Sequence, residues 1–203
     1  MFNSTSSINP TTFNSQVVLF QKNEAPGYGE IAVAWHVIQN CGIGDNHPFE
    51  FPIGMSVAAS DSYGNFTPQL PANPGDAFTM AITQSGDQLI ASGNATSPTD
   101  VQVTNALGTG SINVWIYKGG KKLATKTNAV PMEKAVFVLK PKLFIGVASQ
   151  VVEGAIMDSA VISAINTQLS LVGIASADII MTGGGSGPTS TPYKFTISNV
   201  VMA

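Results

Sequence analysis

The residue types that could carry out chemistry at neutral pH gather in one segment of the chain, 34–51. This segment holds both histidines, His36 and His47, and the only cysteine, Cys41. A thiol with a histidine within hydrogen-bond reach forms a nucleophile–base pair. The glycine-rich run after the cysteine could expose backbone N–H groups that lower a thiol pKa or hold an oxyanion. The segment therefore offers Cys41 with His36 or His47 as the catalytic candidates of a small hydrolase-type enzyme.

The same segment contains the side-chain types that coordinate zinc, since Asp45 and Glu50 accompany the two histidines and the cysteine. Their spacing matches neither a paired-cysteine signature nor a His-Glu-x-x-His helix. We therefore predict no metal and no cofactor. His36 and His47 remain the candidate ligands if a metal does bind.

The elements that position these residues favour a structural interpretation of the segment. Residues 31–38 are typical of a strand with apolar residues on both faces, which sets His36 on the face opposite Trp35. Two glycines and two prolines then interrupt regular pairing over 40–52. In this interpretation the segment is a buried strand with its exit turn, and Cys41 is a small buried apolar residue.

Lysines are concentrated in one part of the chain. Residues 118–142 contain seven of the nine lysines and one acid, whereas 1–117 contain one lysine and eight acids. Such lysines can protect edge strands against aggregation. Alternatively they form a basic patch that meets an anionic surface, either an acidic region of a second copy or lipid headgroups. Aromatic residues beside lysines suit an interface, and the candidate contact residues are Trp115, Tyr117, Lys118, Lys121, Lys122 and Lys126.

The composition argues for some partners and against others. The chain has no arginine, the side chain best suited to bidentate phosphate contact, and its net charge is −3. We therefore predict no nucleic-acid partner. Only 10% of the residues are charged, so little repulsion keeps copies apart, which predicts a homo-oligomer. A glycan or lipid surface is the other expected partner.

Short apolar runs separated by turn residues predict a mainly β chain, an antiparallel β-sandwich or barrel-like domain. The clearest hairpin joins 111–118 to 121–127 through two consecutive glycines. A second hairpin is expected over 78–91, and a long one over 178–202 closes the chain.

The secondary structure of one region is ambiguous, whereas the boundaries of the expected domain are not. Residues 149–172 carry a helical stripe, but Gly154 and many β-branched residues weaken it, so one helix and a strand–turn–strand both remain open. Residues 1–15 are polar and read as a flexible N-terminal arm. Residues 16–203 are then expected to form a single β-sandwich-type domain.

The sequence leaves three functions in competition. A non-enzymatic β-sandwich protein that self-assembles or binds a surface ligand is favoured, because no recognisable catalytic motif is present. The alternatives are a lipid- or glycan-binding protein of toxin or lectin type, and the Cys41 enzyme described above. No signal peptide is visible and no apolar run reaches the ~18 residues of a membrane helix. We therefore expect a cytoplasmic or non-classically exported protein.

Overall fold

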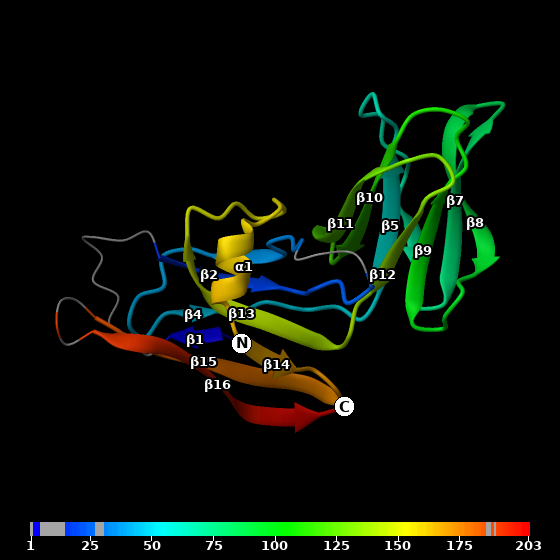
Figure 1. Ribbon diagram of the computed structural model, residues 1–203. Helices are drawn as coiled ribbons and strands as arrows, with labels where there is room; N and C mark the ends of the chain where they lie inside the picture. The colour runs from blue at the N-terminus through cyan, green and yellow to red at the C-terminus, as the bar shows by residue number, and fades with distance from the viewer. Residues whose placement is uncertain (1, 5–14, 27–30, 186–187, 189) are drawn as a thin grey trace. The chain divides into compact units, whose positions relative to one another are not determined.

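The structure is a computed structural model that describes residues 2–4, 15–26, 31–185, 188 and 190–203 (Figure 1). Within these residues the chain forms strands and one short helix, α1. The mainly β fold class predicted from the sequence is confirmed. No helix in the described ranges is long and apolar enough to cross a membrane.

The chain divides into two compact units, which are described separately. The first unit comprises Met1–Gln21, Ala34–Glu50 and Pro141–Ala203, and the second comprises Lys22–Val33 and Phe51–Lys140. The predicted arm over 1–15 lies outside the described residues apart from 2–4 and 15. The prediction that residues 16–203 form a single domain stays a prediction.

The first unit contains two four-stranded sheets. One has the strand order β16-β15-β1-β4, formed by Thr191–Met202, Ile174–Gly184, Phe2–Ser4 and Asn46–His47. The other has the order β14-β13-β2-β3, formed by Thr167–Ser170, Lys142–Ser149, Ser15–Phe20 and His36–Ile38. Neighbouring strands are antiparallel except for β1 and β15, which are parallel.

The second unit also contains two four-stranded sheets. One has the order β11-β10-β5-β6, formed by Lys121–Ala129, Ile112–Lys118, Met55–Ser60 and Leu70–Ala72. The other has the order β12-β9-β7-β8, formed by Lys134–Val138, Asp100–Asn105, Asp76–Thr83 and Gly86–Asn94. Among the described strands of this unit, only β7 and β9 pair in parallel. All four sheets of the molecule are open, and none closes on itself within the described residues.

Local sequence signals account for the hairpins. Strands β10 and β11 pair so that Lys118 lies opposite Lys121. The two residues between them, Gly119 and Gly120, have φ values of 60° and 75°. A two-residue turn of this kind requires positive φ at both positions, which glycine adopts without steric cost. The hairpins predicted over 78–91 and 178–202 are confirmed as β7–β8 and β15–β16.

The ambiguous region 149–172 contains both a helix and a strand. Helix α1 covers only Ser159–Ala164, where the Asp158 side chain accepts a hydrogen bond from the backbone N–H of Ala160 at 3.2 Å. Strand β14 then pairs antiparallel with β13. The helix lies over the β13–β2 pair in Figure 1, and its Ile162 is fully buried, which stabilises the unit by roughly 1.5–3 kcal/mol.

Ile165, the residue that follows helix α1, packs closely against Gly146 of β13. A Cβ placed on Gly146 of β13 would lie 2.5 Å from Cγ1 of Ile165. Ile165 therefore packs directly onto the backbone of β13, and only glycine leaves room for it.

The strand predicted over 31–38 is shorter than expected, because β3 includes only His36–Ile38. The preceding residues pair with a loop instead of a strand. The backbone N–H of Ala34 donates to the carbonyl of Ala155 at 3.0 Å, and the N–H of Gly154 donates to the carbonyl of Ala34 at 2.8 Å. Both backbone groups of Ala34 are thus satisfied without a longer ladder.

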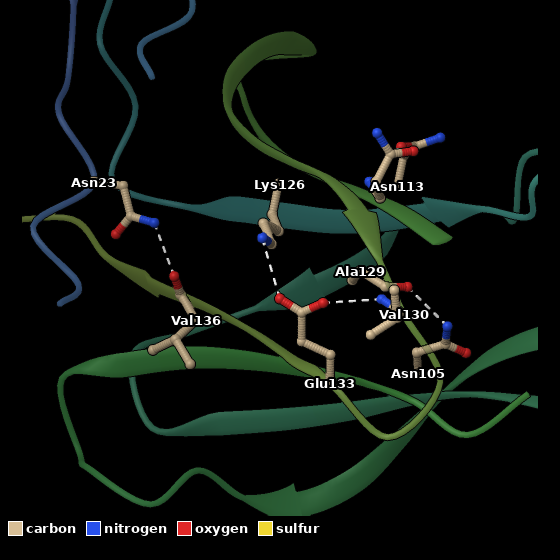
Figure 2. A network of polar contacts seen from close by, with 9 residues as sticks. Asn23, Asn105, Asn113, Lys126, Ala129, Val130, Glu133 and Val136 are labelled. Atoms are coloured by element: carbon tan, nitrogen blue, oxygen red, sulfur yellow. Dashed lines mark hydrogen bonds and ion pairs between the residues drawn. The ribbon is translucent and has the colours of Figure 1, made fainter. Parts of the chain in front are cut away.

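A buried asparagine links separate strands in the second unit. Asn105, at the end of β9, is 0% exposed. Its side-chain amide donates to the carbonyls of Gly110 at 3.0 Å and Ala129 at 2.9 Å, and its side-chain oxygen accepts from the N–H of Leu107 at 3.0 Å. Figure 2 shows the bond from Asn105 to Ala129, the last residue of β11. Because β9 and β11 belong to different sheets, Asn105 connects the two sheets of this unit.

Candidate ligand-contact surface

All four lysines and both aromatic residues of the predicted contact set belong to the second unit, and the structure adds two phenylalanines to them. We call Phe51, Phe66, Trp115, Lys118 and Lys122 the lysine–aromatic surface; these residues form two separate contacts, one of Trp115 with Phe66 and Lys122 and one of Lys118 with Phe51. Its centre is the β10–β11 hairpin, which carries Trp115, Lys118 and Lys122. Neither phenylalanine was among the residues selected from the sequence.

Trp115 and Phe66 form the aromatic part of this surface. Their ring centroids lie 4.8 Å apart and the ring planes are inclined by 33°. The Nζ atom of Lys122 lies 5.5 Å from the centroid of the Trp115 ring, in the range of a cation–π interaction. Phe66 is 57% exposed and Trp115 is half-buried, so the pair presents an aromatic edge with an ammonium group beside it.

The position of Phe66 is set by the turn that precedes it. The carboxylate of Asp61 accepts hydrogen bonds from the backbone N–H groups of Tyr63 and Asn65, both at 2.9 Å, and from the Asn65 side chain at 2.7 Å. These bonds, that of the Asn65 side chain first, lower the pKa of Asp61. Beyond the turn, Thr67 exchanges hydrogen bonds with Ala59 of β5. Phe66 is therefore held between two anchored residues.

Lys118 makes the second lysine–aromatic contact. Its Nζ atom lies 4.4 Å from the centroid of the Phe51 ring. Burial of the ammonium group lowers the pKa of Lys118. This lysine is therefore partly desolvated before any ligand arrives, which reduces the further cost of contact with an anion.

The other residues of the predicted contact set lie in different surroundings. Tyr117 is only 9% exposed, and burial raises the pKa of its phenol. The register shift in the β10–β11 ladder between Ile116 and Tyr117 inserts Leu123 into β11, whereas β10 keeps an unbroken register with β5. Lys126 pairs with one carboxylate oxygen of Glu133 at 3.1 Å. Lys121, which lies opposite Lys118 across the turn, is half-buried.

Figure 2 shows how the Lys126–Glu133 pair is held. The second carboxylate oxygen of Glu133 accepts a hydrogen bond from the backbone N–H of Val130 at 2.9 Å. This bond, followed by the contact with Lys126, lowers the pKa of Glu133. Lys126 thus takes part in the connection between β11 and β12 and does not belong to the lysine–aromatic surface.

The cysteine predicted as a nucleophile is placed in the interior of the first unit. Cys41 is 1% exposed and its Sγ atom donates to the carbonyl of Ile38 at 3.8 Å. Desolvation raises the pKa of the thiol to about 11, which outweighs a hydrogen bond from the Val17 backbone. The thiol is therefore protonated at neutral pH, and the thiolate that nucleophilic catalysis needs is disfavoured.

One of the histidines has a carboxylate partner that the sequence did not reveal. The Nδ1 atom of His36 lies 2.8 Å from Oε2 of Glu153, and the same oxygen accepts the N–H of Val37 at 3.0 Å. The imidazole ring also contacts Trp35 and Phe49, with centroid distances of 5.7 and 5.8 Å. These contacts attach the loop around Glu153 to β3, and a separation of 117 residues leaves no local signal for them.

Two other polar residues of segment 34–51 take part in strand pairing or in a turn. His47 lies in β4, which pairs with β1. The carboxylate of Asp45 accepts the N–H of Gly42 at 2.6 Å and so closes the turn. Within the described ranges no three His, Cys, Asp or Glu side chains gather as a metal site.

The candidate site thus rests on contacts within the second unit. The structure brings Trp115, Lys118 and Lys122 into contact with aromatic rings, and it gives Cys41 the Ile38 carbonyl as its side-chain hydrogen-bond partner. Comparison with protein-family models, with curated proteins and with solved structures found no match for this chain.

Proposed function

We propose that this protein is a non-enzymatic binding protein whose lysine–aromatic surface contacts an anionic ligand. The observation that carries the proposal is the pairing of two lysines with aromatic rings, Lys118 with Phe51 and Lys122 with Trp115. An ammonium group held over a ring is positioned before binding, so less side-chain entropy is lost when an anion arrives.

The ligand class follows from what the surface offers. Lysine supplies a point charge, while the partly exposed ring of Phe66 supplies apolar contact beside it. A ligand that fits must present a carboxylate, sulfate or phosphate group next to an apolar face. Acidic glycans and anionic lipid headgroups share this chemistry. The buried, protonated thiol of Cys41 gives the enzyme alternative no comparable support.

Binding to two probes tests the proposal. The full chain is titrated with a sulfated polysaccharide and, separately, with vesicles that contain an anionic phospholipid, at low and at physiological salt. We expect binding to at least one probe that weakens with salt. Binding to the polysaccharide alone identifies a glycan ligand, whereas binding to vesicles alone identifies a lipid surface.

Matched lysine variants locate the contact. Lys122→Gln is expected to weaken binding about fivefold, since one lysine near an anionic surface contributes about 1 kcal/mol. Lys134→Gln removes the same charge from an exposed position on β12, and it should leave the affinity unchanged. Equal losses in the two variants, or no binding to either probe by the unmodified chain, would refute the proposal.

A further inference from the structure

The turn of the β10–β11 hairpin lies against the loop 51–54, which leads into β5. A Cβ placed on Gly119 of the turn would lie 3.2 Å from Cγ of Pro52. The Nζ atom of Lys118 lies 4.4 Å from the centroid of the Phe51 ring. Two contacts within the second unit thus hold this loop beside the turn.

Ile53, inside this loop, is almost wholly open to solvent. Its exposed fraction is 96%, and the next highest value among the large apolar side chains in the described ranges is 90%, that of Tyr63. The neighbouring Gly54 and the turn glycines are exposed too, and glycine has no side chain that could cover Ile53. A single exposed apolar residue is common on protein surfaces, so the charges around it decide what it does.

The charges next to this loop are mostly positive. Segments 51–60 and 111–127, which form the loop, β5 and the β10–β11 hairpin, contain four lysines and no acidic residue. Three of these lysines adjoin the glycine turn: Lys118, Lys121 and Lys122. The acid nearest to the loop along the chain is Glu50, which directly precedes it. One negative charge against three positive ones leaves this end of the hairpin cationic.

We propose that this end of the hairpin is a membrane contact, at which Ile53 inserts into an anionic bilayer while the three lysines pair with phosphate headgroups. The inference rests on the proposed ligand contact and identifies its ligand as a lipid surface. Interfacial binding strengthens with the apolar area that is inserted and with the attraction to anionic lipids, and this loop with its turn supplies both. The long lysine stems keep the ammonium groups at headgroup level. A glycan has no hydrocarbon interior that could receive Ile53.

Co-sedimentation of the full chain with vesicles of phosphatidylcholine and phosphatidylserine tests the proposal. Ile53→Ser is expected to weaken binding about tenfold or more, because the transfer of the side chain from water to hydrocarbon is lost. Ile82→Ser is the matched control. Ile82 is 71% exposed on β7, and the β7–β8 hairpin contains no lysine. This variant should bind vesicles like the unmodified chain.

A dye at the same two positions measures insertion directly. Ile53→Cys and Ile82→Cys are labelled with an environment-sensitive thiol dye, which spares the native Cys41 because that thiol is 1% exposed. On vesicles, the emission of the dye at position 53 should shift to shorter wavelength. Lipids with a spin label in the acyl chain should quench it. The dye at position 82 should show neither effect.

The outcomes separate this inference from the proposed function. Vesicle binding that Ile53→Ser leaves unchanged, or that Ile82→Ser weakens equally, overturns the insertion and leaves the ligand contact standing. A dye at position 53 that stays in water on bound vesicles does the same. Binding of the sulfated polysaccharide without binding of vesicles also overturns the insertion and identifies a glycan ligand. Binding to neither probe overturns both proposals.

Discussion

Replacing Asn105 with alanine should destabilise the second unit strongly. The substitution removes three hydrogen bonds, those to Gly110, Ala129 and Leu107, at distances of 2.9–3.0 Å. Ala129 and Leu107 are buried, whereas Gly110 is exposed and its carbonyl can turn to water. Each buried polar group that loses its partner costs about 1–3 kcal/mol. For these two buried groups together, we therefore expect the free energy of unfolding to fall by about 2–6 kcal/mol.

Urea denaturation followed by tryptophan fluorescence measures this loss. Trp115 belongs to the second unit and Trp35 to the first, so a Trp35→Phe background makes the emission report on the second unit alone. Asn94→Ala is the control, because Asn94 is exposed at the end of β8 and lies in the same unit. It should shift the midpoint little. A loss below about 0.5 kcal/mol for Asn105→Ala, the size of an ordinary surface substitution, would refute the argument that Asn105 connects the two sheets.

Three further perturbations have defined outcomes. Gly146→Val should lower the thermal midpoint of the first unit by the equivalent of about 1–3 kcal/mol, because the new side chain meets Ile165 at 2.5 Å; a midpoint equal to that of the unmodified chain would contradict this packing. Asp61 has a lowered pKa in the folded state, so its stabilisation is present above the usual value of 3.8 and is lost as the pH falls through the lower folded pKa. Acid titration of Asp61→Asn should show a shallower loss of stability between pH 3.8 and the lower folded pKa, and an unchanged acid profile would contradict it. Cys41, with a pKa of about 11 against a usual 9.0, should react with a thiol reagent at neutral pH about a hundredfold more slowly when folded than in urea, because thiolate is the reacting form; equal rates would show that the thiol is accessible and ionised.

Hairpins were the part of the fold that the sequence predicted best. The signals for β10 and β11 are local, since alternating apolar residues flank two glycines that tolerate positive φ. The region 149–172 shows the opposite case. Its apolar stripe is compatible with a helix or strands, and pairing with β13 decides that only Ser159–Ala164 is helical. Tertiary contacts decide between states when local preference is weak.

The candidate site was predicted only in part, for similar reasons. The sequence pointed to Trp115, Lys118 and Lys122, but the aromatic partners Phe51 and Phe66 come from segments far along the chain. Tyr117 shares the pattern of Trp115, yet it is buried. The contact between His36 and Glu153, which are 117 residues apart, likewise has no local sequence signal.

The most direct test of the ligand-contact surface is an NMR titration of the isotope-labelled full chain with the probe that binds. The account predicts that the largest chemical-shift changes fall on the indole N–H of Trp115 and on the backbone amides of Lys118 and Lys122. Amides of β8 should shift little. Changes centred on His36 and Cys41, or spread evenly over both units, would contradict the assignment of the lysine–aromatic surface as the contact site.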